Sequence, residues 1–162
     1  MKPLYTLGLA ALLPFVATAQ EAAAIDPSVQ VQTATEAVVQ PYGPRDAAEV
    51  VFDDLLYQLR PVVVFADSPA DPNFLRQMEL LARDLAALEL RDVILVTDTD
   101  PDARGEWRLK LRPRGFSLVL MDKDLRPVIR KPLPLDVREI VAAIDKFPLR
   151  RQEILERNPA GR

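Results

Sequence analysis

The sequence predicts an α/β fold in which a four-stranded mixed sheet lies between layers of helices. Two apolar runs without polar alternation, 62–66 and 93–96, are typical of strands buried on both faces, as in a parallel sheet. Helical spacing of apolar residues precedes, separates and follows these runs. Because parallel strands need a long crossover, the helix between the two runs makes them parallel, with a right-handed connection.

The first 19 residues have the three parts of a secretory signal peptide. Lys2 is followed by an apolar run from Leu4 to Val16 and then by Ala17-Thr18-Ala19, a typical cleavage site. The run is shorter than the roughly 20 residues that span a bilayer. We therefore expect cleavage after Ala19, a periplasmic or secreted chain and no stable membrane insertion. An uncleaved N-terminal anchor is the alternative.

Residues 20–45 lack large apolar side chains at any regular spacing and contain scattered prolines. Such a segment cannot bury enough apolar surface to offset its chain entropy, so we predict a flexible linker. A short edge strand at 29–31 is the alternative. The rest of the chain is predicted to form one domain over residues 46–157, followed by a disordered end at 158–162.

The first half of this domain is predicted to contain two helices around the first buried strand. Asp46 and Glu49 resemble a capping box that opens an amphipathic helix reaching Leu59. After strand 62–66, Asp71 and Pro72 are typical of a helix N-cap and first helical residue. A single helix of about 18 residues is then predicted by apolar residues three or four apart. They are Phe74, Met78, Leu81, Leu85 and Leu88.

The second half is predicted to hold three helices and a β-hairpin. We expect the hairpin strands to be charged and partly exposed, because Asp, Lys and Arg cluster around them. Asp136 and Glu139 form a capping box for the last core helix, and Phe147-Pro148 separates it from a charged tail helix. In chain order the elements are a helix at 101–111, hairpin strands at 116–121 and 126–130, and helices at 136–144 and 149–157.

The composition excludes several chemistries. The chain contains no Cys and no His. It therefore lacks the thiols of redox catalysis, the usual general base near neutral pH and the commonest ligand of zinc, copper and nickel. The formal net charge is −3, with both signs interspersed, which argues against a nucleic-acid partner. We expect no cofactor and no thiol oxidoreductase activity.

The order of elements resembles the thioredoxin superfamily, whose fold is a three-layer sandwich. In that superfamily a Cys-x-x-Cys pair lies between the first buried strand and its long helix, where this chain has Asp67-Ser68-Pro69-Ala70. Arg114-Gly115 stands in the place of the superfamily's cis-proline, with Pro113 out of register. The resemblance thus implies the fold without its redox chemistry.

Four further features resemble a family of small exported bacterial proteins known only as a thioredoxin-like domain of unknown function. The likeness covers about residues 55–153 and implies no activity. The features are Arg60-Pro61, Arg91-Asp92, Asp122-Lys123-Asp124 and the ending Ile144-Asp145-Lys146-Phe147-Pro148-Leu149-Arg150-Arg151-Gln152-Glu153.

Ligands of open α/β sheets bind beyond the carboxyl ends of the parallel strands. The candidates that the sequence places at this rim are Asp67, Ser68, Asp71, Asp98, Asp100 and Arg114. Carboxylate oxygens suit Ca²⁺ or Mg²⁺, and the weak metal candidates are Asp67, Asp98 and Asp100, with Asp102 nearby. The alternative is that Asp71 and Asp100 cap helices and the others are solvated turn residues. Ser68 has no His partner for nucleophilic catalysis.

A basic strip surrounds the single tryptophan of the chain. It consists of Arg104, Arg108, Lys110, Arg112 and Arg114. Such a strip suits an anionic ligand or an acidic partner, and its alternative is a solvated helix face paired to the acidic rim. Trp107, Arg150 and Arg151 are the candidates for partner docking. For the tail helix that contains Arg150 and Arg151, the alternative to docking is a solvated helical cap on the domain.

These observations favour a non-catalytic module that binds a protein or a small ligand of unknown identity at the rim of the sheet. The alternative is a small carboxylate- or metal-dependent hydrolase that uses Asp67, Asp71 and Asp98. Mutation of these aspartates distinguishes the two, because helix-capping or paired aspartates support stability and catalytic ones generally do not.

Overall fold

Residues 43–158 are described by the structure, a computed structural model. The predicted signal peptide at 1–19, the alternative strand at 29–31, nearly all of the predicted linker and residues 159–162 lie outside the described residues.

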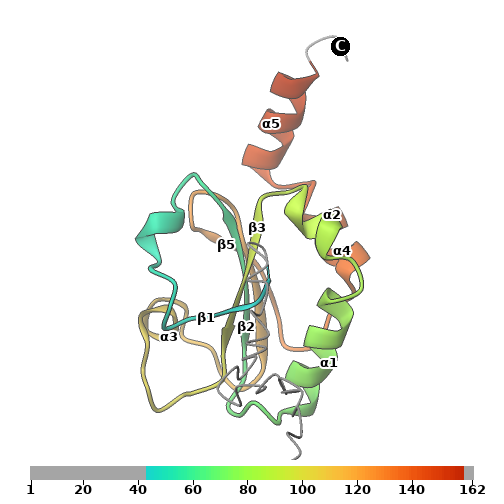
Figure 1. The fold of residues 1–162 in the computed structure, drawn as a ribbon. Helices are drawn as coiled ribbons and strands as arrows, with labels where there is room; N and C mark the ends of the chain where they lie inside the picture. The colour runs from blue at the N-terminus through green and yellow to red at the C-terminus, as the bar shows by residue number, and fades with distance from the viewer. Residues whose placement is uncertain (1–42, 159–162) are drawn as a thin grey trace, which may run out of the picture. The chain divides into compact units, whose positions relative to one another are not determined.

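A five-stranded mixed sheet forms the centre of the domain, in the order β1-β3-β2-β4-β5 (Figure 1). Strands β1, β2 and β3 are parallel, whereas β4 runs antiparallel to both β2 and β5. This is the predicted thioredoxin-like α/β arrangement with one additional strand, because Arg45 and Asp46 pair with β3. The strands are β1 Arg45–Asp46, β2 Arg60–Phe65, β3 Val93–Asp98, β4 Ser117–Met121 and β5 Pro127–Lys131.

Side chains of the central strands alternate between two apolar layers. Val62 and Val64 contact the layer that contains α1, α2 and α4, and Val63 and Phe65 contact the layer that contains α3 and residues 47–59 (Figure 1). Both faces of the sheet are therefore covered. This explains why the sequences of β2 and β3 show no polar alternation.

The predicted hairpin is present, but the two strands differ in burial. Every residue of β4 is buried, because β4 pairs with β2 on one side and β5 on the other. The expectation of a charged, partly exposed strand is therefore wrong for β4. It holds for β5, an edge strand in which Ile129 alone is partly buried.

The single long helix predicted after β2 is two helices, α1 Pro72–Leu81 and α2 Leu85–Glu89. Asp71 is the N-cap of α1 as predicted, since its Oδ1 accepts N–H groups of Asn73 at 2.7 Å and Phe74 at 3.1 Å. The break arises because the Asp84 carboxylate accepts the N–H of Ala87 at 3.0 Å and begins a new helix. Apolar spacing does not reveal the break, because both helices bury leucines in the same layer.

The predicted helix from Asp46 to Leu59 is wrong. Residues 47–52 form turns, and only Asp53–Leu55 form a short 3-10 helix, η1. Phe52 and Leu55 are buried against the sheet, so apolar contact sets the path of this segment. Tyr57 then turns the chain in the left-handed region, at φ 59°, and donates its N–H to the Lys123 carbonyl at 2.7 Å.

The third helix is shorter than the predicted range 101–111. α3 spans Glu106–Leu111, because residues 101–105 form a turn in which Asp100 Oδ1 accepts the N–H groups of Asp102 and Ala103. The last two helices agree with the prediction. They are α4 Val137–Ile144, N-capped by Asp136, and α5 Pro148–Arg157, which extends past the end of the sheet (Figure 1).

Among residues 43–158, no helix combines the length and the apolar character needed to span a bilayer.

Candidate functional site

The residues that follow β2 and β3 meet the residues that precede β4 at one edge of the sheet, which we call the carboxyl rim. Phe65 lies between Asp98 and Ser117 in the register of the sheet. The loop after β2 also approaches the loop before β4, since a Cβ built on Gly115 would lie 3.8 Å from Asp67 Oδ2. The predicted convergence of Asp67, Asp98 and Arg114 at this rim is therefore present.

Arg108 of α3 joins the ends of the two parallel strands. Its Nε donates to Asp98 Oδ1 at 2.8 Å, and its Nη2 donates to the backbone carbonyls of Ala66 and Asp98. Its guanidinium also lies 5.6 Å from the Phe65 ring centroid and 3.8 Å from Asp67 Oδ1. The charge of Asp98 is therefore neutralised by a nearly buried arginine of the same chain.

The remaining acidic residues of the rim are engaged locally or exposed. Asp71 caps α1, and Asp98 Oδ1 also accepts the N–H of Asp100 at 3.2 Å. Asp100 accepts N–H groups within its own turn, and the side chain of Asp67 is 60% exposed. Residues 43–158 contain no group of three or more carboxylates placed to hold a metal ion. Nothing in this arrangement favours the hydrolase alternative.

Ser68 lies at the carboxyl rim, as predicted, in an exposed turn. Its Oγ accepts the N–H of Ala70 at 3.2 Å, which is the local bond of a serine turn. The sequence contains no His, and among residues 43–158 Ser68 Oγ has no hydrogen bond to another side chain, so Ser68 is a turn residue.

A basic hollow of about 550 Å³ opens next to the carboxyl rim, between the loop before β4 and the end of β5. Its volume lies within the range of about 300 to 1,000 Å³ that is usual for small-ligand sites. Arg114, predicted as a rim residue, and Arg112, a member of the predicted basic strip, line it together with residues that the sequence did not suggest. The lining consists of Arg112, Arg114, Arg130, Leu111, Phe116 and Pro132, and Ser117 completes it.

The other members of the predicted basic strip have separate environments. Lys110 donates to Asp53 at 3.0 Å, and hydrogen bonds to Asp53 and Glu106 raise the pKa of its ammonium. Trp107 is 1% exposed, and its indole N–H donates to the Val50 carbonyl at 2.9 Å. The interpretation of Trp107 as a docking residue is therefore wrong, because this side chain is part of the core. Arg104 is exposed and does not line the basic hollow.

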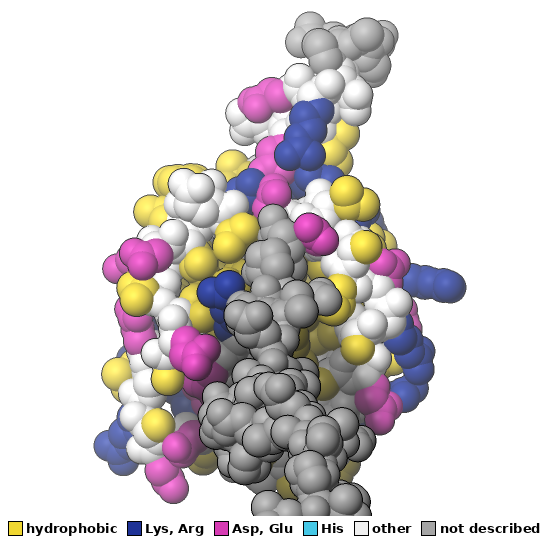
Figure 2. Space-filling model, viewed as in Figure 1, with side chains coloured by type: hydrophobic (Ala, Val, Ile, Leu, Met, Phe, Trp, Pro, Cys, Tyr) yellow, Lys and Arg dark blue, Asp and Glu magenta, His cyan; other side chains and the backbone are white. Residues whose placement is uncertain are grey.

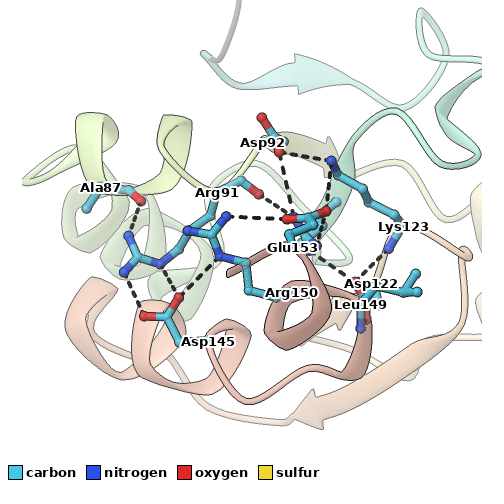
Figure 3. Close-up of polar contacts among 10 residues, drawn as sticks. Ala87, Arg91, Asp92, Asp122, Lys123, Asp145, Leu149, Arg150 and Glu153 are labelled. Carbon is cyan, nitrogen blue, oxygen red and sulfur yellow. Dashed lines mark hydrogen bonds and ion pairs between the residues drawn. The ribbon is translucent and has the colours of Figure 1, made fainter. Parts of the chain in front are cut away.

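A second cluster of charges lies at the opposite end of the sheet, where β2 and β3 begin. We call it the Arg60 network (Figure 3). The fully buried Arg60 donates to Asp122 Oδ1 at 3.0 Å, Glu153 Oε1 at 2.8 Å and the Arg91 carbonyl at 2.9 Å. The members are Arg60, Arg91, Asp92, Asp122, Lys123, Asp145, Arg150 and Glu153.

The Arg60 network connects α5 to the sheet. Lys123 lies 3.1 Å from Glu153, and Asp122 Oδ2 accepts the N–H of Leu149 at the start of α5. Burial disfavours ionised Glu153, but hydrogen bonds from Arg60 and Lys123 outweigh this effect and lower its pKa to about 2. Acidic and basic side chains are interspersed where α5 meets the rest of the domain (Figure 2).

Arg150 and Arg151, both predicted for docking, differ in exposure. Arg150 is 8% exposed and lies 3.3 Å from Glu153 Oε2, so it belongs to the network, whereas Arg151 is exposed. Asp145 accepts two hydrogen bonds from Arg91, at 2.9 and 2.7 Å. These bonds are the main reason that its pKa is lowered.

Sequence reasoning missed the Arg60 network as a structural unit, although the signal was present. The features that resemble the family of unknown function contain Arg60, Arg91-Asp92, Asp122-Lys123 and the C-terminal run to Glu153. All four meet in this one network. No comparable sequence signal marks Arg130 and Phe116 of the basic hollow. An arginine in an edge strand and an aromatic residue at the start of a buried strand are both common in proteins of any function.

Known proteins resemble this chain in sequence or in structure. Residues 51–153 match the family described as Domain of unknown function (DUF4174). Two solved structures are also similar to this chain, Plasmodium yoelii Prx1a modified at the N-terminus, which forms an artifactual octamer, and Plasmodium yoelii thioredoxin peroxidase I. Each has 14% sequence identity and a TM-score of 0.48, over 67% of this chain and 81% and 80% of the respective neighbour. No curated protein matches the chain. The predicted likeness at 55–153 thus coincides with the match, and the chain belongs to the DUF4174 family.

Proposed function

We propose that this domain is a non-catalytic binding module whose ligand sits at the carboxyl rim of the sheet. The observation that carries the proposal is that the rim is open to a ligand but lacks the groups of thiol catalysis. The loop after β2, Asp67-Ser68-Pro69-Ala70, is exposed and contains no sulfur, while an open basic hollow lies beside it. The place where this fold class binds ligands is therefore accessible but lacks a nucleophile paired with a base.

The chemistry available to the chain supports binding rather than catalysis. No Cys or His occurs anywhere in the sequence. The most buried rim carboxylate, Asp98, is held by Arg108 at 2.8 Å and is not directed into the basic hollow. Without a thiol, an imidazole or an unpaired buried carboxylate, the rim offers contacts for a ligand and few groups that transfer a proton or an electron.

The proposal includes export of the chain to the periplasm or the cell exterior. Its support is the Lys2, apolar run and Ala17-Thr18-Ala19 pattern at the N-terminus. N-terminal sequencing of the protein from the cells that contain it tests this part, and the expected first residue is Gln20. A chain that still begins at Met1 contradicts it.

Activity assays test the non-catalytic part. Purified protein is expected neither to consume hydrogen peroxide in the presence of dithiothreitol above the rate without protein, nor to accelerate reduction of insulin disulfides. Turnover that copurifies with the chain and survives removal of contaminants overturns the proposal.

Site-specific crosslinking tests binding at the rim. A photoreactive phenylalanine replaces Ala70, an exposed residue of the rim. The control carries the same group at Leu90, which is also exposed but lies next to Arg91 of the Arg60 network, at the opposite end of the sheet. Irradiation in the native cells is followed by intact-mass and gel analysis, which detect small and large adducts. We expect an adduct from position 70 and little from position 90. Equal yields, or none from position 70, contradict the proposal.

A further inference from the structure

The chemistry of the basic hollow narrows the class of ligand, if the proposed binding function is correct. We infer that the hollow binds a small organic anion in which a carboxylate or sulfonate is attached to an apolar body. Two features support this inference: arginines without acidic partners and an apolar floor. A third feature, the backbone conformation of Arg112, supplies a matched control variant.

The polar wall of the hollow is formed by Arg112, Arg114 and Arg130. None of the three is within 4.0 Å of a carboxylate among residues 43–158, and no Asp or Glu lines the hollow. Arg130 is held in place because its Nη2 donates to the Leu111 carbonyl at 2.7 Å. Guanidinium groups bind carboxylate and sulfonate oxygens through paired N–H donors, so this wall is suited to an anionic head group.

The floor of the hollow is apolar. Leu111 and Phe116 are only 7% and 8% exposed, yet they contribute to its surface, and Pro132 extends it towards the end of β5. A fully hydrated inorganic anion would leave this floor uncovered. An apolar body beside the anionic group would cover it and gain the free energy of burying apolar surface.

Arg112 occupies a position at which the fold alone favours glycine. It ends α3 in the left-handed region, at φ 47° and ψ 58°, where its N–H donates to the Arg108 carbonyl at 2.8 Å. Glycine is the usual residue at such a helix end because a Cβ is strained there. The side chain of Arg112 lies beside the hollow, and its left-handed backbone conformation lowers the stability of the fold relative to glycine.

Arg104 provides a matched control. It is also an exposed arginine in the left-handed region, at φ 47°. Arg104 lies just before α3, and Arg112 lies just after it. Arg104 differs in that it does not line the hollow. Replacing either residue by glycine removes one positive charge and relieves the same backbone strain, so only binding distinguishes the two variants.

Fluorescence of anilinonaphthalene sulfonate, an aromatic sulfonate, tests the inference on the purified chain. We expect saturable binding that decanoate displaces and that acetate or decanol at the same concentration does not. Arg112→Gly is expected to weaken binding about tenfold or more, the effect of losing a charge-assisted hydrogen bond. Arg104→Gly is expected to change it by less than about twofold. Both variants should melt no lower than the parent.

Three results overturn the inference: no saturable binding of the probe, displacement by acetate or inorganic phosphate as effective as by decanoate, or equal weakening by Arg104→Gly. The proposed function is tested separately, because a rim adduct at position 70 without probe binding means that the rim has a different ligand. Absence of the adduct contradicts the proposed function, with or without probe binding.

Discussion

The two ends of the sheet use charge in opposite ways. At the end where β2 and β3 begin, the Arg60 network pairs four basic with four acidic residues, and its central arginine is fully buried. At the carboxyl rim, Arg112, Arg114 and Arg130 are exposed and have no acidic partner among residues 43–158. Charges that are paired and buried fix elements relative to one another, whereas exposed unpaired charges remain available to a ligand.

Arg108 shows that the distinction is one of environment and not of residue type. It lies at the carboxyl rim, but its nearly buried guanidinium binds Asp98 and two backbone carbonyls. In this respect it resembles Arg60 more than its neighbour Arg112. We therefore divide the rim into a structural half, around Arg108, and a candidate binding half, around the basic hollow.

Removal of Arg60 is expected to have the largest effect on stability. Arg60→Met leaves Asp122 buried without its 3.0 Å partner and removes the bond between β2 and Glu153. Leaving a buried charge uncompensated costs about 3–5 kcal/mol. Urea denaturation followed by circular dichroism measures the free energy of unfolding. The matched change Arg114→Met at the exposed rim should cost less than about 0.5 kcal/mol. Equal losses would show that the two ends do not differ as described.

Removal of Arg108 is expected to have the next largest effect. Arg108→Met leaves the nearly buried Asp98 carboxylate and the carbonyl of Ala66 without this donor. We expect a loss of about 2–4 kcal/mol, below that of Arg60 because Arg108 is partly solvated. The double variant Arg108→Met with Asp98→Asn should lose less than the sum of the single changes. Additive losses would contradict a direct pair.

The pH dependence of stability should report the Arg60 network. The pKa of Glu153 is lowered from 4.5 to about 2 in the folded chain. Because the folded pKa is depressed, the contribution of Glu153 is present above pH 4.5 and is lost as the pH falls towards 2. We expect this loss to be about 1–3 kcal/mol. Unfolding free energies measured across this range should fall less steeply for Glu153→Gln, and an unchanged slope would contradict the assignment.

The sequence predicted the elements that depend on local chemistry and apolar runs. β2 and β3 are recognisable because they are buried on both faces, and Asp71-Pro72 and Asp136 mark helix starts through hydrogen bonds to nearby N–H groups. The segment at 46–59 resembles a helix in sequence because Asp46 and Glu49 have capping-box spacing ahead of Leu55 and Leu59. In the structure the ring of Phe52 packs against that of Trp107, and the two ring centroids lie 4.8 Å apart. A contact so distant in sequence leaves no local pattern.

For the candidate site, too, the sequence predicted what depends on strand order and missed what depends on distant contacts. Convergence of Asp67 and Asp98 follows from strand direction, because the parallel strands β2 and β3 end at the same edge, and Arg114 joins them because the antiparallel strand β4 begins there. Which acid is neutralised, and by which arginine, depends on how α3 packs. The basic hollow requires the position of Arg130, which is set by the β4–β5 register and the bond to Leu111. Neither relation can be read from spacing.

The smallest expected effect on stability distinguishes an aspartate that caps a helix from an aspartate that lies in an exposed turn of the rim. Asp67 and Asp71 lie four residues apart on either side of an exposed turn, but only Asp71 accepts N–H groups of α1. Asp71→Ala should cost about 1 kcal/mol, the usual value of an N-cap, and Asp67→Ala less than about 0.5 kcal/mol, because its side chain is mostly exposed. Melting of both variants with and without Ca²⁺ checks this. If Ca²⁺ stabilises the parent chain but not Asp67→Ala, Asp67 binds a cation, and the interpretation of Asp67 as a solvated turn residue is wrong.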